Sequence, residues 1–446
     1  MPARRSRLPR LGVPELAVLA ALVLLVAGAL LLGGGGEEEG GPPRTTVSPQ
    51  RLARVERAVE QIRGLRFRRP VRVEVMTPEE TRRYGVAESA RETTAAQTAA
   101  DGELAKLLGT LAPDVDLDAV TSDLFGEQVA GFYDPRNGRL VLVDGVGIDD
   151  VTLAHELTHA LEDQQFDLQR LGDPGRGAVV DGDAAIGESG LVEGTATAVM
   201  TRYLQQRPDA LTLGEAFGQL LGASGGRPLP PSIMRTLLFP YQAGERFVDR
   251  LYRTTGDWRL VDNALRDRPP ASSAELYDPT RWLRVTRPEP VALPPAGAPG
   301  AGWRRVRETT FGELDLRELL HDALGGGAAG RVGERWAGGR VALWRRGPLP
   351  APDCAAPCRA RDALALRLRL DSPAAARATA AALSRWLSAT LRAEPAAPPA
   401  ASRPRRAAAP RAYRLPGGSA GLLAVGGREV RVALAPDGAL AARLLR

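Results

Sequence analysis

The sequence predicts an α+β protein of two domains that follow one transmembrane helix. Three observations support this prediction. Residues 16–32 form an uncharged apolar run near the N-terminus. Segments with helical spacing and segments with strand-like alternation both occur in residues 48–287. The Pro- and Gly-rich stretch 288–300 then separates them from a second set of such segments, in a chain long enough for more than one domain.

The N-terminal region predicts a membrane anchor. Four arginines lie before the apolar run, and Glu37, Glu38 and Glu39 follow it. With its flanks the run can span the roughly 30 Å of bilayer hydrocarbon, and the basic flank places the N-terminus in the cytoplasm. A cleaved signal peptide is the alternative. We expect a cytoplasmic N-terminus at 1–12, a signal anchor at 13–34 and a linker at 35–47, in a single-pass protein of the cell membrane with its main domain extracytoplasmic.

The overall composition is that of a folded protein, with 44% apolar and 25% charged residues. The formal net charge is +6, but the basic residues are almost all arginine, with Lys106 as the single lysine. These arginines are scattered among Ala, Gly and Pro and form no patch interleaved with aromatic residues. Since clustering rather than total charge marks a nucleic-acid-binding surface, we expect no nucleic-acid partner.

The first domain is expected at 48–287. The stretch 129–145 (VAGFYDPRNGRLVLVDG) predicts a β-hairpin, because two β-rich runs flank the turn residues 134–138. Asp149 or Asp150 then begins a helix that contains HELTHALEDQ. The other expected elements are a strand at 70–76 and helices at 48–63, 77–85, 87–111, 188–206, 232–238 and 242–254.

The second, smaller domain is expected at 301–446 as an α+β accessory domain. Strand-like runs occupy 340–346 and 363–370, a helix follows from residue 373, and short strands close the chain. The low-complexity segment 394–411 predicts disorder. Cys354 and Cys358 either form a local disulfide, which an oxidising compartment favours, or remain reduced.

The stretch HELTH predicts a zinc site. His155 and His159 are four residues apart, so on a helix they share one face and can place ring nitrogens on one ion. Glu156 lies beside them and can act as general base, because zinc lowers the pKa of a bound water to about 7. The alternative is a pair of ordinary histidines on a packed helix.

A catalytic zinc site needs a third protein ligand. Glu193, in LVEGTA on the next predicted helix, is the first choice, and Glu188 on the same helix is the alternative. Glu162 follows His159 too closely to be a third ligand from one straight helix, so we expect it to support the ligands or to face solvent.

Three further residues have side chains suited to a role at this site. His321, the remaining histidine, is interpreted as an ordinary exposed helical residue. Asp181 and Asp183 could orient a ligand histidine, although ordinary polar loop residues are the favoured interpretation.

HELTH followed by a helical glutamate resembles the gluzincins, zincin-type zinc peptidases that use two histidines and a glutamate on a second helix. PYQAGERFVDRL (240–251) resembles the Pro-Tyr segment of their aminopeptidase branch, in which the tyrosine binds the oxyanion of the tetrahedral intermediate. The resemblance implies that role for Tyr241, a tyrosine that packs at a helix start being the alternative. FYDP, HELTHALEDQ, LVEGTA and PPASSAELYDP also make residues 50–290 similar to bacterial exported HExxH proteins of undefined substrate.

Departures from the aminopeptidase pattern favour an endopeptidase. The gap from His159 to Glu193 is longer, and no Gly-x-Met-Glu-Asn segment is present to hold a free amino end. RLVLVD (139–144) is expected to be an edge strand that pairs with extended substrate. We therefore predict a membrane-anchored, extracytoplasmic zinc metallopeptidase that acts on peptides or proteins. The alternatives are a zinc hydrolase of a non-peptide substrate and a non-catalytic anchored binding protein that retains the zincin fold.

Overall fold

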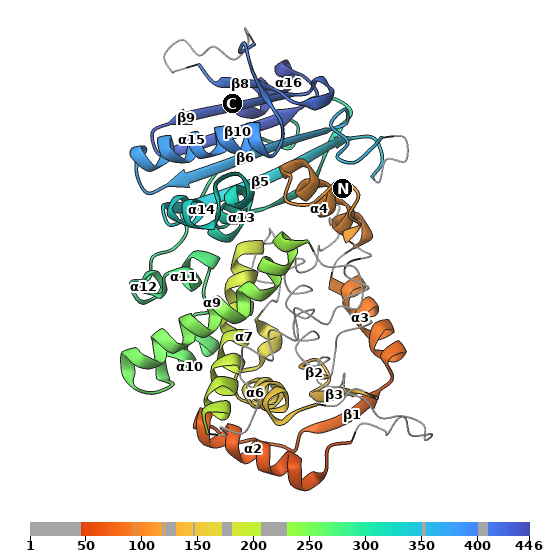
Figure 1. The fold of residues 1–446 in the computed structure, drawn as a ribbon, viewed down its shortest axis with the longest axis vertical. Helices are drawn as coiled ribbons and strands as arrows, with labels where there is room; N and C mark the ends of the chain where they lie inside the picture. The colour runs from red at the N-terminus through yellow and green to blue at the C-terminus, as the bar shows by residue number, and fades with distance from the viewer. Residues whose placement is uncertain are drawn as a thin grey trace, which may run out of the picture.

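The computed structural model describes residues 46–92, 94–117, 120, 131–145, 148–171, 181–206, 230–349, 354–399 and 409–446. Figure 1 shows two sheets at opposite ends of the long axis, with a layer of helices between them. A three-stranded sheet lies at one end and a seven-stranded sheet at the other. The predicted metal-binding helix belongs to the end with the smaller sheet.

The predicted fold class needs correction in two respects. The structure is a mixed α/β fold in which 53% of the described residues are helical, so the expected α+β class is wrong. In the smaller sheet β1 (Arg72–Met76) pairs with β3 (Arg139–Val143) in parallel, which requires a long crossover connection that spacing within each segment does not reveal. In addition, within the described residues no helix combines the length and apolar character needed to cross a membrane. The anchor predicted at 13–34 lies outside those residues.

The smaller sheet has the order β1-β3-β2, and β2 (Gly131–Asp134) forms the predicted hairpin with β3. The helix α6 (Asp150–Phe166) follows the hairpin and packs against both of its strands. The helix α2 (Pro49–Arg63) covers α6, with Val55 and Val59 fully buried in the shared core. Hairpin, α6 and α2 thus form one compact layer around the HELTH stretch.

The central layer consists mainly of α7 (Gly182–Gln205) and α9 (Pro231–Thr255). Two helices were predicted at 232–238 and 242–254, but α9 is one continuous helix that contains Pro240. Proline lacks an N–H and disfavours a helix interior, so the packing of α9 along α7 overrides that local preference. The short helices α10 (Arg259–Arg266), α11 (Ser273–Tyr277) and α12 (Pro279–Leu283) complete this layer.

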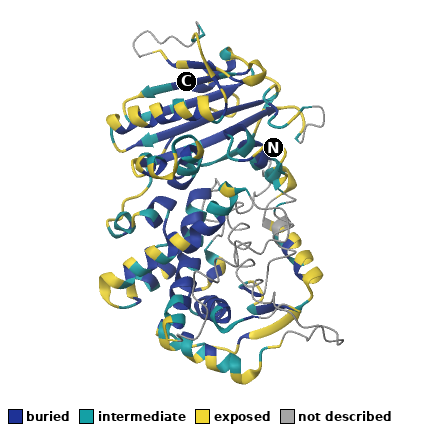
Figure 2. Ribbon diagram, viewed as in Figure 1, coloured by how far each residue is buried: buried dark blue, intermediate teal, exposed yellow. Residues whose placement is uncertain are grey.

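The larger sheet is antiparallel throughout, with the order β4-β5-β6-β10-β9-β8-β7. Figure 2 shows its central strands as buried and the outer sides of the covering helices as exposed. The strands are β4 (Trp303–Thr310), β5 (Trp336–Arg346), β6 (Asp362–Leu370), β7 (Glu394–Ala396), β8 (Arg411–Arg414), β9 (Ala420–Gly426) and β10 (Glu429–Ala435). Disorder was expected for residues 394–411, but β7 and the first residue of β8 lie at the two ends of this segment, so its ends are ordered strands. The structure does not describe residues 400–408.

Helices cover both faces of this sheet. One face packs against α13 (Glu313–Leu324), α14 (Gly326–Gly333) and α15 (Pro373–Ala389), and the other against α16 (Gly438–Leu445). The helix α4 (Ala95–Leu108) also joins the first face through Leu104, Leu107 and Leu108, although its residues precede the metal-binding helix in sequence. The core of the larger sheet therefore draws on residues that the predicted boundary at 287–301 assigns to the first domain.

A disulfide joins Cys354 and Cys358, which is the favoured of the two sequence alternatives. The loop that it closes is bound to α4, because the backbone N–H of Cys358 donates to the Glu103 carboxylate. Arg345 on β5 lies between Glu103 and Asp362 and forms a buried ion pair with Asp362. These contacts fix α4 to the larger sheet.

Candidate metal centre

The helix α6 begins at a capped residue and is buried along almost its whole length. The Asp149 side chain accepts hydrogen bonds from the backbone N–H groups of Val151 and Thr152, which satisfies donors that a helix start leaves free. Beyond this cap, Leu153 and Leu157 are fully buried in the core. This packing fixes the rotation of α6 and turns His155 and His159 toward α7.

Three side chains from α6 and α7 converge on one point. The Nε2 atoms of His155 and His159 are 3.1 Å apart, and Glu193 Oε2 lies 3.4 Å and 3.7 Å from them. The three residues are 2–3% exposed, and their potential ligand atoms all lie within 4.8 Å of one another. This buried group of two imidazoles and a carboxylate could hold a metal ion.

The position of Glu193 depends on a close contact between α7 and α9. A Cβ added to Gly194 would lie 2.1 Å from the carbonyl carbon of Gly244, and one added to Gly244 would lie 1.9 Å from the carbonyl oxygen of Gly190. The two helices can therefore approach this closely only because Gly194 and Gly244 carry no side chain. The contact brings Tyr241, one turn before Gly244, to the same place as Glu193.

The ring of Tyr241 stacks on the ring of His155, with centroids 6.0 Å apart and planes 16° apart. The phenol is 2% exposed, and its hydroxyl makes no hydrogen bond to the described residues. Burial, together with the nearby Glu193 and Glu156 carboxylates, raises the pKa of Tyr241 well above its ordinary value. The phenol therefore keeps its proton and can act as a hydrogen-bond donor at the site.

Burial and the neighbouring charges shift the pKa values of the three converging groups in different directions. Burial lowers the pKa of His155. Burial also opposes the charged form of His159, but the Glu193, Glu156 and Glu162 carboxylates outweigh it and raise the His159 pKa. Although burial alone would raise it, the two histidines lower the pKa of Glu193 to about 2. A carboxylate that is ionised at neutral pH thus faces two imidazoles, as metal coordination requires.

Glu156 is held against the hairpin. Its Oε2 atom accepts a hydrogen bond of 2.9 Å from the backbone N–H of Tyr133 on β2, while its Oε1 atom is buried without a hydrogen-bond partner among the described residues. Burial is the main reason that the pKa of Glu156 rises to about 8, and Glu193 adds to the effect. A carboxyl with a raised pKa beside a candidate metal site is typical of a catalytic general base.

The sequence alone does not show the part that Tyr133 plays here, although Tyr133 lies in the FYDP stretch that resembles other proteins. Besides its N–H bond to Glu156, the Tyr133 hydroxyl donates to Asp163 Oδ2 at 2.8 Å. Asp163 lies two turns after Glu156 on α6, so Tyr133 joins β2 to α6 at two points. The second bond needs the side chain of Tyr133. The tyrosine in FYDP is therefore the feature of the sequence that could have indicated this contact.

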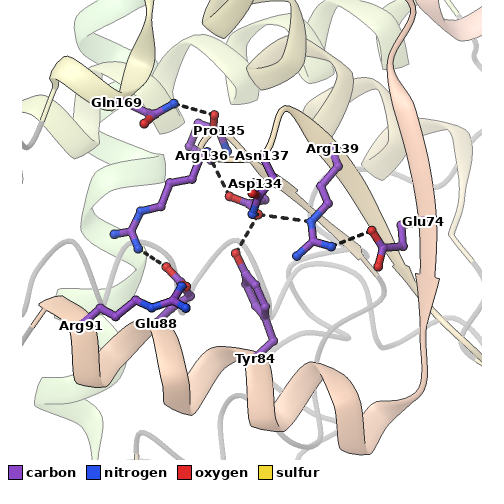
Figure 3. Close-up of polar contacts among 10 residues, drawn as sticks. All are labelled: Glu74, Tyr84, Glu88, Arg91, Asp134, Pro135, Arg136, Asn137, Arg139 and Gln169. Carbon is purple, nitrogen blue, oxygen red and sulfur yellow. Dashed lines mark hydrogen bonds and ion pairs between the residues drawn. The ribbon is translucent and has the colours of Figure 1, made fainter.

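Asp134, the next residue of FYDP, organises the turn of the hairpin (Figure 3). Its carboxylate accepts hydrogen bonds from the hydroxyl of Tyr84 on α3 (Pro78–Glu92) and from three groups of the hairpin itself. The Tyr84 ring also stacks on Phe132, with centroids 5.5 Å apart. Figure 3 further shows Glu88 of α3 between Arg91 and Arg136. These contacts hold α3 against the hairpin that carries the Glu156 partner.

The remaining candidate residues lie apart from the converging group. Glu188 is partly exposed, and His321 is partly buried near the end of α13; neither belongs to the group. Glu162 is fully buried and forms an ion pair of 2.7 Å with Arg63 of α2, so it joins two helices rather than facing solvent.

Asp181 and Asp183 do not orient a histidine. Asp181 caps α7 and accepts a hydrogen bond from Thr310, while Asp183 accepts one from the backbone of Ser273. Burial, then the like charges of Asp315 and Asp181, raises the pKa of Asp183 well above its ordinary value. Both residues act at the start of α7, ten or more positions before Glu193.

The predicted role of residues 139–144 as an edge strand is wrong. Residues 139–143 form β3, which is the central strand of the smaller sheet and pairs with β1 on one side and β2 on the other. Sequence alternation cannot reveal which strand occupies the edge, because that depends on pairings with distant segments. Of the described strands beside the metal centre, β2 is the edge strand.

Comparisons with protein-family models, with curated proteins and with solved structures find no match to this chain. The similarity to gluzincins therefore stays a prediction from the sequence motifs. The arrangement of His155, His159 and Glu193 carries the functional argument by itself.

Proposed function

We propose that this protein is a zinc-dependent metallopeptidase that hydrolyses internal peptide bonds. The observation that carries the proposal is the convergence of His155, His159 and Glu193 beside a buried glutamate, Glu156. Two imidazoles and a carboxylate form a ligand set of catalytic zinc sites, which use three protein ligands and leave a position open.

The donor chemistry fits zinc better than a harder cation. Imidazole nitrogen suits zinc, copper, iron and nickel, whereas magnesium and calcium favour oxygen ligands. Glu193 Oε2 is buried and has no hydrogen-bond partner in the described structure, although it faces both Nε2 atoms. A buried anionic oxygen is costly without a positive partner, and a cation among these three atoms would supply one.

Bound zinc would polarise the substrate carbonyl and lower the pKa of a coordinated water to about 7. Glu156 would accept the proton of that water and pass it to the leaving amine. Its hydrogen bond to Tyr133 N–H holds one carboxyl oxygen on β2 and leaves the other for this transfer. The positive charge of the ion would favour the ionised form of Glu156, opposing the effect of burial.

Tyr241 is the candidate oxyanion donor. Its hydroxyl is protonated, lacks a partner among the described residues and lies beside the ligand group. A donor that is already in place and unpaired stabilises developing negative charge without reorganisation. The Gly194–Gly244 contact supports this role, because it holds Tyr241 and Glu193 on adjacent helices.

A peptide is the substrate class that the hairpin favours. The Tyr133 N–H points to Glu156 rather than to β3, so this side of β2 faces the metal centre. An extended peptide that pairs with β2 would lie across the metal centre, since main-chain pairing with an edge strand is a common mode of peptide recognition.

The disulfide between Cys354 and Cys358 supports an extracytoplasmic location. Such bonds persist in oxidising compartments and are rare in the reducing cytoplasm.

Replacement of Glu156 by glutamine tests the reaction. The full chain should bind about one zinc ion by elemental analysis, and E156Q should bind the same amount because Glu156 is not a ligand. E156Q should lose cleavage of casein and of a peptide library. Cleavage equal to that of the wild type would contradict the mechanism.

The same variant separates the two alternatives. A hydrolase of a non-peptide substrate would bind zinc but leave the peptide library intact in both forms. A non-catalytic binding protein would show no difference between wild type and E156Q in any hydrolytic assay, and the buried Glu156 with its hydrogen bond to β2 would then have no catalytic use.

A further inference from the structure

The helices that carry Glu193 and Tyr241 both begin against the larger sheet and its helices. In Figure 1, α7 and α9 both start near α13 and pack against each other, and α7 then runs toward α6 while α9 runs toward α10. Glu193 lies ten residues after Asp183, about 15 Å along the axis at the usual helical rise. Because a packed helix moves as a rigid rod, the position of its first turn determines where Glu193 lies relative to the two histidines.

Thr310, the last residue of β4, bridges two residues at the start of α7. Its hydroxyl donates a hydrogen bond of 2.7 Å to the Asp181 carboxylate and accepts one of 2.9 Å from the backbone N–H of Asp183. Asp181 Oδ1 in turn caps the helix by accepting from Ala184 N–H at 3.0 Å. The Thr310 hydroxyl is therefore hydrogen-bonded both to the capping residue Asp181 and to a backbone N–H in the first turn of α7.

The Asp183 side chain extends this junction to α11 and α13. It is 2% exposed and accepts a hydrogen bond of 3.0 Å from the backbone N–H of Ser273. The Ser273 hydroxyl accepts one from the backbone N–H of Leu314 in the first turn of α13. A Cβ added to Gly312 would lie 1.9 Å from the Asp183 carboxylate, so the carboxylate fits directly against the backbone before α13.

The start of α9 is held by the same neighbour. Arg235, in its second turn, forms an ion pair of 2.7 Å with Glu318 of α13. The Ser232 hydroxyl donates to the carbonyl of Thr110, just after α4. Thus α13 contacts α9 through Glu318, and Gly312 at its start lies against Asp183 of α7. The Gly194–Gly244 contact joins α7 and α9 again beside the metal centre.

We propose that Thr310 is a positioning residue for the metal centre: through Asp181 and the first turn of α7 it sets the distance of Glu193 from His155 and His159. The larger sheet then helps to position the metal centre of the proposed enzyme and is not a separate accessory domain. This inference rests on the proposed function, since it assumes that Glu193 binds the ion.

Substitution of Thr310 by valine removes the hydroxyl and keeps the side-chain shape, whereas T310S keeps the hydroxyl. T309V is the matched control, because the hydroxyl of Thr309 on the same strand makes no hydrogen bond within the described part of the chain. Zinc affinity is measured for each full-length variant by competition with a chelator at a temperature where circular dichroism shows folded protein. Values of kcat and KM are measured on the same samples.

We expect T310V to weaken zinc binding about ten-fold, a typical effect of losing a group that supports a ligand, and to lower kcat more than KM. T310S and T309V should bind zinc like the wild type. A merely structural role would lower the thermal midpoint of T310V but leave its zinc affinity unchanged, and that result would overturn the proposal.

A second variant covers the case in which T310V does not fold. D181A removes the carboxylate that accepts from the Thr310 hydroxyl and caps the first turn of α7, and we expect weaker zinc binding in the same direction. Unchanged zinc affinity in folded D181A would then overturn the proposal. If the wild-type chain itself binds no zinc, the proposed function fails; if it binds zinc and the folded variants bind it equally well, only the positioning role fails.

Discussion

Gly194 of α7 and Gly244 of α9 lie in direct backbone contact, and a Cβ on Gly194 would come within 2.1 Å of the Gly244 carbonyl carbon. Glu193 immediately precedes the first glycine, and Tyr241 lies one turn before the second. The pair therefore explains why glycines occur in both the LVEGTA and the PYQAG stretches. Close approach of two helices is what places a candidate ligand and a candidate oxyanion donor at one site.

Substitution of Gly244 by alanine should disrupt this contact. The added Cβ would lie 1.9 Å from the Gly190 carbonyl oxygen, so α9 must shift away from α7. Overpacking of this kind costs typically about 1–3 kcal/mol, and we expect a lower unfolding midpoint and reduced zinc content, measured by urea titration and elemental analysis. G297A is the control, because a Cβ there meets no atom within 4 Å. Equal stability and zinc content in both variants would contradict the role of the contact.

The third ligand can be identified by comparing two glutamates of one helix. Glu193 Oε2 lies 3.4 Å and 3.7 Å from the histidine nitrogens, whereas Glu188 is partly exposed and outside the converging group. We expect E193A to lose most bound zinc and E188A to retain it, as measured by elemental analysis after dialysis. Retention of zinc by E193A together with its loss from E188A would reverse the assignment.

Replacement of Tyr241 by phenylalanine tests the oxyanion role. The ring that stacks on His155 is kept and only the hydroxyl is removed, so zinc content and stability should stay close to wild type. Loss of an oxyanion donor typically lowers kcat by about 10²–10³-fold. We expect a decrease of that order with little change in KM on a fluorogenic peptide. A wild-type kcat would assign Tyr241 to packing alone.

The parts of the site that follow from local geometry were predictable from sequence. His155 and His159 share a face because their spacing matches one helical turn, and Glu193 could be chosen because it lies on the next helix. The sequence does not show that Glu162 meets Arg63 of α2, 99 residues earlier in the chain, or that β3 is central in its sheet. These features depend on long-range pairing, which residue spacing within a segment does not encode.

The same limit explains the errors at the level of the fold. α4 has an ordinary helical signal, yet its leucines are buried in the core of the larger sheet, beyond the predicted boundary. Tyr133 reaches Glu156 through a backbone N–H, a group that every residue except proline carries. No residue type could therefore reveal that contact. The hydrogen bond from the Tyr133 hydroxyl to Asp163, in contrast, needs a tyrosine, which can be read from the sequence.

The buried carboxyl of Asp183 should make stability depend on pH. Burial, followed by the like charges of Asp315 and Asp181, raises its pKa well above the ordinary value. A folded state that holds a proton more tightly than the unfolded state gains stability from it. This contribution is complete below the pKa of an unfolded aspartic acid, about 3.9, and is lost as the pH rises through the raised value in the folded protein.

D183N does not titrate and keeps an acceptor for the Ser273 N–H. We therefore expect the free energy of unfolding, measured in urea at a series of pH values above 4, to fall more steeply for wild type than for D183N. Because all other titrating groups are shared, parallel curves would show that Asp183 is not protonated preferentially in the folded chain.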